Sequence, residues 1–272
     1  MKILLTSDIH DCHLDWYGTA TDTRLRQWAA DICREHEKAP LDMILMLGDY
    51  ALDFWFDGGS FVRRGESRTK HFLDTYVTLL PRVPIYMIPG NHEQYSPEKW
   101  REITGSDRYL TAVKDNAMFI MTDSYAGDLG PAEDSDGTYV PVDCAWVKEQ
   151  LKKHDCEHVF ICTHGFEIPK ETDEFRELVA NDSRIKCLFQ GHYHLSSVID
   201  LGPDWGGKKI LQTGNYSYTS DPGGPEASFW GYRLLEIDRS RLSSEYVMCA
   251  CDFIYKDKKM HIDRHSVDCW NN

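Results

Sequence analysis

The chain has 272 residues, of which 42% are hydrophobic and 27% are charged, and its formal net charge is -14. This composition is typical of a globular protein with a sizeable core, and no stretch approaches the roughly 20 apolar residues that span a bilayer. The negative charge and the absence of any long basic run argue against long nucleic acid or a membrane as partner.

The first part of the chain alternates short apolar runs with amphipathic stretches. The N-terminal run is too short for a signal peptide and is followed at once by Asp8, so we expect a strand that leads into a site. Strands are expected at Lys2–Thr6, Met43–Leu47, Ile85–Ile88 and Ala117–Met121. Helices are expected between them, at Thr23–Lys38, 66–80 and 97–104.

The second part changes character as it proceeds. Residues 122–141 are rich in Asp, Gly and Pro, which predicts a solvated loop that includes the acidic tract Glu133–Asp136. Helices are then expected at 144–153 and Thr172–Ala180, and strands at His158–Cys162 and Ile185–Phe189. The remaining strands are joined by turns and are expected at Val198–Leu201, Lys209–Gln212, Tyr232–Ile237, Glu245–Cys251 and Lys259–Asp263.

This order of elements predicts the fold class. The chain begins as β-α-β and ends as a β meander, a pattern typical of an α/β fold with two packed mixed sheets and helices on the outer faces. We therefore expect a four-layer α/β/β/α sandwich that forms one domain over residues 1–272.

Nine cysteines occur at irregular spacings, and none form a Cys-x-x-Cys pair. Zinc knuckles and thioredoxin-type redox sites are therefore unsupported. The odd number favours reduced, mostly buried thiols and a cytoplasmic location. Cys249 and Cys251 alternate along one predicted strand, and we expect both to pack in the core.

Five short polar clusters each follow a predicted strand. They are Asp8-Ile9-His10, Gly48-Asp49, Gly90-Asn91-His92-Glu93, Thr163-His164-Gly165 and Gly191-His192-Tyr193-His194. Ligands bind beyond the carboxyl ends of strands in α/β sheets, so we expect the clusters to converge at one edge. The glycines beside them permit tight turns and close approach of the backbone.

The clusters combine carboxylates, an amide and imidazoles without any thiolate. Such hard and borderline ligands hold divalent metals. Two metals about 3.5–4 Å apart are a known device for in-line displacement at phosphorus, and they generate a nucleophile from water near neutral pH. The sequence therefore predicts an enzyme that cuts phosphoesters.

In the order of these clusters the chain resembles the calcineurin-like metallophosphoesterase superfamily, whose pattern runs Asp-x-His, Gly-Asp, Gly-Asn-His, a lone His and Gly-His-x-His. The resemblance covers residues 4–194. It implies two metal sites that share one bridging carboxylate. One site is formed by Asp8, His10 and His194, the other by Asn91, His164 and His192, and the bridge is Asp49.

The resemblance also implies a mechanism. His92 is not a ligand but contacts the phosphate and helps to protonate the leaving oxygen, while a hydroxide held between the metals attacks phosphorus. The cofactors would be two divalent ions, and manganese, iron, zinc and magnesium all suit such ligands.

Two departures from the family pattern follow Asp49. A second Asp often stands three residues after the metal Asp, but here it is Asp53, one residue late, so we assign it no role. The Arg that protein phosphatases of the superfamily carry next is absent, and Phe54-Trp55-Phe56 stand there instead.

Several segments have two interpretations. The insert Phe54–Arg64 could bring Trp55, Arg63 and Arg64 to a substrate base and phosphate, or it could be a packed surface loop or an oligomer contact, which we favour. The segments Gly214–Tyr216 and Asp221–Gly224 either line the site or are plain connections. His13 is expected to be a loop histidine.

The expected function is hydrolysis of a phosphodiester or phosphomonoester of a small molecule or nucleotide. A serine/threonine-type protein phosphatase acting on a phosphoprotein is the alternative. A nuclease is disfavoured by the net charge, and a metal-free binding scaffold is disfavoured by the complete set of ligands.

Overall fold

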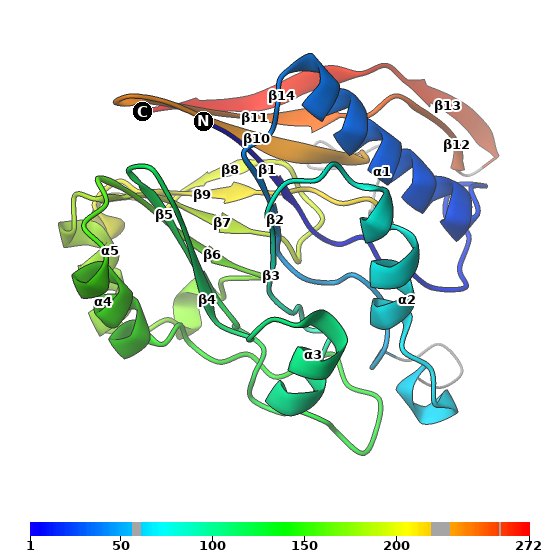
Figure 1. Cartoon of the computed structure of the whole chain (residues 1–272), viewed down its shortest axis with the longest axis horizontal. Helices are drawn as coiled ribbons and strands as arrows, with labels where there is room; N and C mark the ends of the chain where they lie inside the picture. Colours follow the sequence, from blue (N-terminus) through cyan, green and yellow to red (C-terminus); the bar gives the residue numbers. More distant parts are fainter. Residues whose placement is uncertain (56–60, 219–228, 256) are drawn as a thin grey trace.

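The computed structural model describes residues 1–55, 61–218, 229–255 and 257–272. Its centre is a pair of six-stranded sheets packed face to face (Figure 1). The first sheet has the order β14-β11-β10-β1-β2-β3 and the second the order β4-β5-β6-β7-β9-β8. Both sheets mix parallel and antiparallel neighbours, since β1-β2-β3 and β5-β6-β7-β9 are parallel and the flanking pairs are antiparallel.

The strand bounds follow the apolar runs of the sequence. The first sheet consists of β1 (Lys2–Thr6), β2 (Met43–Met46), β3 (Ile85–Met87), β10 (Gly231–Asp238), β11 (Arg241–Met248) and β14 (His265–Asn271). The second consists of β4 (Leu110–Lys114), β5 (Ala117–Thr122), β6 (His158–Thr163), β7 (Ile185–Gln190), β8 (Val198–Asp200) and β9 (Lys209–Gln212). A separate ribbon pairs β12 (Cys251–Tyr255) with β13 (Lys258–Ile262).

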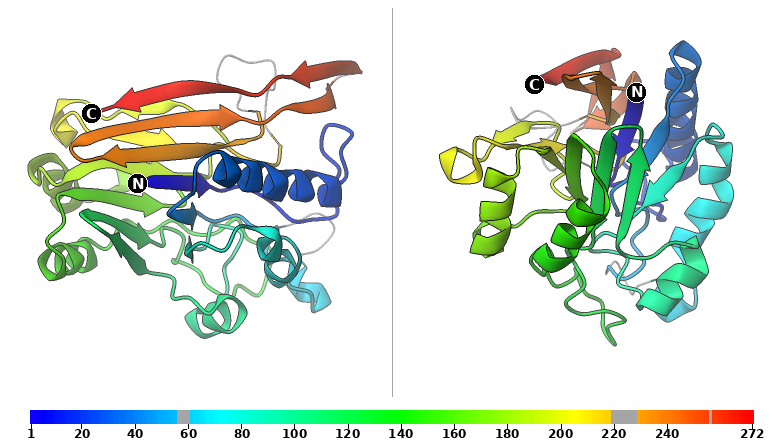
Figure 2. Two further views of the ribbon diagram at one scale, coloured as in Figure 1. Left: turned by 45° about the horizontal axis from the view of Figure 1, so that its top comes forward. Right: turned by 60° about the vertical axis from the view of Figure 1, so that its left-hand side comes forward.

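Helices cover the outer face of each sheet (Figures 1 and 2). The first sheet is covered by α1 (Thr21–Lys38), α2 (Arg68–Thr75) and α3 (Pro97–Thr104), and the second by α4 (Cys144–Lys153) and α5 (Asp173–Asn181). Short 3-10 turns occur at Val62–Arg64, Val77–Leu79, Ile168–Lys170 and Pro203–Trp205. The predicted four-layer α/β/β/α sandwich is thus confirmed.

Alternation along the strands explains why the sandwich has three apolar layers. On β1, Leu4 faces the helices while Ile3 and Leu5 face the other sheet. On β5, Phe119 faces the first sheet, and Ile120 on the opposite face packs against α4 and α5. A strand buried on both faces reads as a continuous apolar run, which is why these strands could be located from the sequence.

The strands differ from the sequence-based expectations in two respects. Strands β4 and β14 were not expected, because neither has a continuous apolar run of its own and each is an antiparallel partner of one neighbour, β5 and β11. The run Glu245–Cys251 does not form one strand, because β11 ends at Met248 and β12 begins at Cys251. Cys249 and Cys251 are nevertheless both buried in the layer under the helices, as expected.

The predicted helix 66–80 is shorter in the structure. Ser67 caps α2 by accepting a hydrogen bond from the Lys70 backbone, and α2 ends at Thr75 before a 3-10 turn. Seven of the nine cysteines are buried, and all nine are free. Among the described residues, no helix combines the length and apolarity needed to cross a bilayer.

Candidate metal centre

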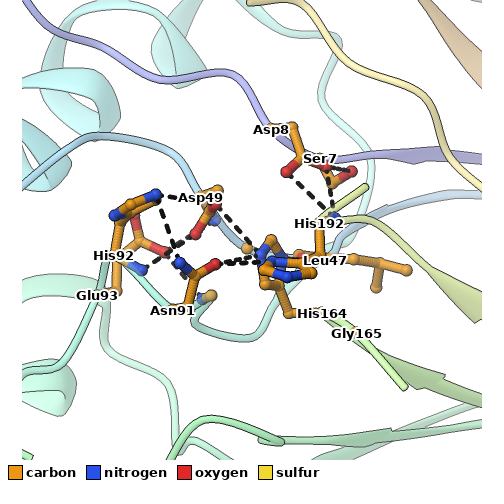
Figure 3. Close-up of polar contacts among 12 residues, drawn as sticks. Ser7, Asp8, Leu47, Asp49, Asn91, His92, Glu93, His164, Gly165 and His192 are labelled. Atoms are coloured by element: carbon orange, nitrogen blue, oxygen red, sulfur yellow. Dashed lines mark hydrogen bonds and ion pairs between the residues drawn. The ribbon is translucent and has the colours of Figure 1, made fainter. Parts of the chain in front are cut away.

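The five polar clusters meet where the two sheets adjoin, beyond the carboxyl ends of β1, β2, β3, β6 and β7 (Figure 3). Strands from both sheets therefore contribute to one site, as the spacing of the clusters along the chain predicts. All seven predicted ligands and His92 lie in this region.

One group of donor atoms comes from the loop after β1 and the segment after β7. Nε2 of His194 lies 3.3 Å from Nε2 of His10 and 3.3 Å from Oδ1 of Asp8. All three side chains are buried. Each offers one donor atom within 4.8 Å of the others, a spacing that suits a single cation.

A second group surrounds the side-chain oxygen of Asn91. This oxygen lies 2.9 Å from Nε2 of His164 and 3.0 Å from Nδ1 of His192. His164 and His192 also form a group of potential ligands with Asp49. The amide oxygen and the two imidazoles are the set that the resemblance implies for the second metal.

Asp49 lies between the two groups. Its Oδ2 is 3.2 Å from Nε2 of His164 and 3.7 Å from Nε2 of His10. Figure 3 shows it between His92 and the pair formed by His164 and His192. This is the placement that a bridging carboxylate requires.

His92 approaches the same carboxylate. Its Nε2 is 3.7 Å from Oδ2 of Asp49, and His10, Asp49 and His92 form a further group whose donor atoms lie within 4.8 Å of one another. Its backbone N–H donates to Oδ1 of Asp49 at 3.2 Å. Distances alone would thus also allow His92 to act as a ligand.

Hydrogen bonds on the far side of two rings fit them for metal binding. Nδ1 of His164 lies 2.6 Å from the Leu47 carbonyl, and Nδ1 of His194 lies 2.6 Å from the Tyr218 carbonyl. A carbonyl accepts only from a protonated nitrogen, so these bonds fix the proton on Nδ1 and leave Nε2 to face the centre. Ligating histidines are commonly oriented in this way. The residues present therefore fit a pair of divalent cations.

Charges and burial shift the pKa values of these histidines in opposite directions. Burial lowers the pKa of His10 well below its ordinary value and that of His192 to about 4, although Asp49 opposes both shifts. Burial also acts on His164, but the Asp49 carboxylate outweighs it and raises the pKa of His164 to about 10. Metal binding needs neutral imidazole, so a cation must displace a proton from His164.

The backbone at the centre is unusual. Among the described residues, nine other than glycine have a positive φ, and five of them are predicted ligands: Asp8, His10, Asp49, His192 and His194. Their φ angles lie between 50° and 66°. Aspartate and histidine visit this region more readily than most residues, yet each such residue still costs about 1–3 kcal/mol. Such backbone clusters at functional sites because the surrounding structure enforces it.

Two of the predicted close-approach glycines are required by their neighbours. A Cβ on Gly90 would lie 2.1 Å from Oδ1 of Asp49. Gly48 has a φ of 94°, and a Cβ there would lie 2.7 Å from Nδ1 of His164. Both glycines let the backbone pass directly beside a predicted ligand.

Glu93 holds the loop that carries Asp49. Its buried carboxylate accepts backbone hydrogen bonds from Asp49 at 2.8 Å, Tyr50 at 2.9 Å, Ala51 at 3.1 Å and Gly90 at 2.9 Å. Burial, with a further contribution from Asp49, raises the pKa of Glu93 to about 8. No role for Glu93 is predicted from the sequence, and its place in the Gly-Asn-His-Glu cluster is the only sequence signal that points to it.

Asp53 supports the fold away from the metal ligands. Its buried carboxylate accepts hydrogen bonds from the backbone of Arg68 at 2.7 Å and from the backbone and hydroxyl of Thr69 at 3.0 and 2.7 Å. It therefore fixes the first turn of α2, which agrees with the absence of a predicted site role.

The acidic tract Glu133–Asp136 lies in a loop, as expected, and one of its exposed residues contacts the site. Asp136 accepts a 2.8 Å hydrogen bond from the Asn91 amide, and its Oδ1 lies 3.6 Å from Nε2 of His92. Burial raises the pKa of Asp136, His92 opposes this shift and Asp49 adds to it. The expected solvated loop is confirmed, since the Asp136 side chain is 67% exposed, but its contact with Asn91 was not predicted because a loop without periodic pattern gives no sign of where its side chains point.

Aromatic side chains surround the centre. The ring centroids of Trp16 and Tyr218 lie 6.1 and 6.0 Å from that of His10, and the Tyr218 centroid lies 4.5 Å from that of His194. The Trp55 ring lies 5.9 Å from His92. Trp55 and Tyr218 are 36% and 39% exposed, so both can meet a ligand. We call Trp16, Trp55 and Tyr218 the aromatic rim.

The arginines of the insert are engaged elsewhere. Arg63 forms an ion pair with Asp134 at 3.4 Å, and the Arg64 guanidinium lies 4.8 Å from the centre of the Phe61 ring. Arg64 and Trp55 help to line a cavity of about 80 Å³. These contacts fit the packed-loop interpretation of the insert, whose residues 56–60 lie outside the described part of the chain.

The structure describes one of the two other segments that have two interpretations, and it also places His13. Asn215 donates to the His194 carbonyl at 3.0 Å, and the Tyr216 backbone donates to the Asp8 carbonyl at 3.1 Å, so Gly214–Tyr216 packs against the ligand loops. The segment Asp221–Gly224 lies outside the described residues. His13 is an exposed loop residue 3.8 Å from Glu66.

Comparison with known proteins agrees with the fold. The model of the calcineurin-like phosphoesterase family matches residues 1–196. No curated protein sequence matches the chain significantly. The structure is similar to purple acid phosphatase from yellow lupin, with a TM-score of 0.61 and 12% identity over 98% of this chain and 53% of that one. The chain thus spans about half the length of the lupin enzyme.

A second similar structure is GAP50, described as the anchor in the inner membrane complex of Plasmodium. Its TM-score is 0.59 at 12% identity, covering 98% of this chain and 88% of that one. At such identities the likeness to both structures shows the fold alone.

Proposed function

Because the chain belongs to the calcineurin-like phosphoesterase family, we propose that it is a metal-dependent hydrolase of a phosphoester of small-molecule or nucleotide size. The family supports metal-dependent phosphoester hydrolysis in general. The observation that carries the proposal for this chain is the position of Asp49, whose Oδ2 lies near imidazoles of both donor groups.

In this proposal the two donor groups hold two divalent ions. Asp8, His10 and His194 would bind one ion, Asn91, His164 and His192 the other, and Asp49 both. When bound, such ions neutralise phosphate oxygens and lower the pKa of water. His92 would contact the phosphoryl group and give its proton to the leaving oxygen, as a positioned general acid.

The aromatic rim supports a small substrate with a planar ring. Trp55 and Tyr218 are partly exposed at the edge of the centre, where the face of a nucleobase or similar ring could stack on them. Stacking of a base on an aromatic side chain contributes about 1–3 kcal/mol.

Two alternative functions have weaker support. The first is a protein phosphatase, because the Gly-Asn-His-Glu cluster looks phosphatase-like. The Glu93 of that cluster, however, is buried and accepts hydrogen bonds from four backbone N–H groups, so it is not available to a substrate. A non-catalytic role is the second alternative, since GAP50 is described as an anchor. The complete and oriented donor set argues against it, because a scaffold has no need of carbonyl-oriented imidazoles.

We also propose a reducing compartment such as the cytoplasm. The support is the nine free cysteines, seven of them buried. We further propose that the protein binds neither long nucleic acid nor an anionic membrane surface, because its formal net charge is -14.

The test is a substrate panel with metal analysis. The purified protein is stripped of metal, reloaded with manganese and assayed on nucleotide phosphodiesters, nucleotide monophosphates, nitrophenyl esters and a phosphopeptide. We expect about two metals per chain and metal-dependent turnover that is highest on a small ester. Faster turnover of the phosphopeptide would favour the protein phosphatase, and a protein that neither binds metal nor turns over any ester would favour the scaffold.

A further inference from the structure

Asp136 places a carboxylate beside the residues that would receive the phosphoryl group. Its Oδ1 accepts a hydrogen bond from the Asn91 amide at 2.8 Å and lies 3.6 Å from Nε2 of His92. Its side chain is 67% exposed, whereas that of His92 is 8% exposed. The carboxylate therefore lies between the buried centre and solvent.

The distance from Asp136 to a bound phosphoryl group follows from His92. A phosphoryl or leaving oxygen that hydrogen-bonds Nε2 of His92 lies about 3 Å from that nitrogen. Because Nε2 is itself 3.6 Å from Oδ1 of Asp136, such an oxygen lies within about 7 Å of the carboxylate. Charges at this separation still interact, since the Debye length at physiological salt is about 8 Å.

Asp136 has no lysine or arginine within ion-pair distance among the described residues, and its ion-pair partner is His92 at 3.6 Å. Arg24, which contacts the loop after β1, is buried and donates to the carbonyls of Ile9, His10 and Tyr216. Arg68 pairs with Asp11. No lysine or arginine among the described residues therefore neutralises the Asp136 carboxylate on the solvent side of His92.

We infer that Asp136 is a specificity-determining residue that disfavours phosphomonoesters relative to phosphodiesters. The inference rests on the proposed function and narrows its substrate class. Above about pH 7 a monoester phosphate carries close to two negative charges, because its second pKa is about 6, whereas a diester carries one. The additional charge of the monoester is repelled by Asp136, and the diester avoids that repulsion.

The experiment compares Asp136→Asn with the wild-type protein on two matched esters at pH 8, bis(4-nitrophenyl) phosphate and 4-nitrophenyl phosphate. The substitution keeps the shape and the ability to accept a hydrogen bond from Asn91 but removes the charge. We expect kcat/KM for the monoester to rise about five- to tenfold relative to that for the diester, as unit charges across a partly solvated gap predict. Glu133→Gln is the matched control, because Glu133 is an exposed acid of the same tract.

A binding measurement gives a second readout that does not depend on turnover. Inorganic phosphate, mostly dianionic at pH 8, is titrated calorimetrically into the manganese-loaded proteins, and Asp136→Asn should bind it about five- to tenfold more tightly than wild type or Glu133→Gln. Equal phosphate affinity in all three proteins, or an unchanged monoester-to-diester ratio, would overturn the inference. So would loss of a metal ion from Asp136→Asn, because Asp136 would then be a ligand.

Different results would contradict the proposed hydrolase function and the specificity role of Asp136. If the wild-type protein hydrolyses neither ester with manganese, the proposed function is wrong, and the phosphate titration still decides the role of Asp136. If it hydrolyses both but the ratio does not respond to Asp136→Asn, the function stands and the specificity role is wrong.

Discussion

Oδ2 of Asp49 lies 3.2 Å from Nε2 of His164, although the two residues follow strands of different sheets. Asp49 follows β2 of the first sheet, and His164 follows β6 of the second. The centre is therefore assembled across the interface between the sheets, and its geometry depends on how they pack. A change in the apolar layer between the sheets can thus alter the metal site without touching a ligand.

Replacement of the bridging carboxylate should remove metal and activity together. Asp49→Asn keeps the volume of the side chain but loses the negative charge that both donor groups share. We expect metal content and turnover to fall in parallel, measured by elemental analysis and ester hydrolysis. Asp200→Asn, an exposed aspartate paired with Lys209, is the control that should retain both. Two bound metals with near-normal turnover in Asp49→Asn would contradict the bridging assignment.

His92→Ala should keep both metals and lose turnover. A positioned general acid contributes about 10²–10⁴-fold, so an ester with a poor leaving group should lose about that much in kcat. A nitrophenyl ester should lose less, since its leaving group needs no proton. His13→Ala, at an exposed loop histidine, should leave both rates unchanged. Because His10, Asp49 and His92 also lie within 4.8 Å of one another, loss of a metal would show instead that His92 is a ligand.

Metal uptake should release a proton near His164. The carboxylate of Asp49 outweighs burial and raises the pKa of His164 to about 10 in the metal-free protein, so this ring is protonated at pH 8. Burial keeps His10 and His192 neutral, and they release none. At His194 the Asp8 carboxylate outweighs burial and raises the pKa, so this ring adds to the release. Manganese titrations in two buffers of different ionisation enthalpy should report at least one proton per chain at pH 8, and affinity should rise with pH up to about 10. Uptake without proton release would contradict this assignment.

Glu93→Gln should loosen the loop that presents Asp49. A glutamine offers one accepting oxygen and a donating NH2 group, so backbone N–H groups now bound by the second carboxylate oxygen would lose their acceptor. Supporting residues of this kind typically change metal affinity by about 10–100-fold. We expect the Kd for manganese to rise by that factor and Tm to fall. Glu102→Gln, an exposed helical pair of Lys99, is the control, and an unchanged Kd would show that the four bonds do not position Asp49.

Acid should destabilise the sheet through Glu35. Burial opposes ionisation of this carboxyl, but hydrogen bonds from Lys2 and Tyr232 prevail and lower its pKa to about 2. A depressed pKa stabilises the fold above the unfolded value near 4.5 and loses that effect as pH falls toward 2. Glu35→Gln should therefore cost about 3 kcal/mol at pH 7 and little at pH 2, measured by urea unfolding. Glu37→Gln, an exposed neighbour, should cost little at either pH.

The clusters of predicted ligands could be located from the sequence because each is a contiguous motif at the end of an apolar run. The convergence of Asp8, Asp49 and His164 could be predicted from the rule that ligands bind beyond the carboxyl ends of strands. Asp136 and Tyr218 could not be found in this way, since they reach the site from loops without periodic pattern. The β14 strand was missed because its residues, HSVDCWN, contain no continuous apolar run, and only the pairing with β11 reveals the strand.

The family match ends at residue 196, after the last predicted ligand, yet the chain continues for 76 residues more. That remainder supplies β10, which pairs antiparallel with β1, the strand that leads to Asp8. Truncation after residue 196 would leave every predicted ligand in the polypeptide and expose one whole edge of β1. A nicked or shortened chain should consequently behave like a ligand mutant, although no ligand has been removed.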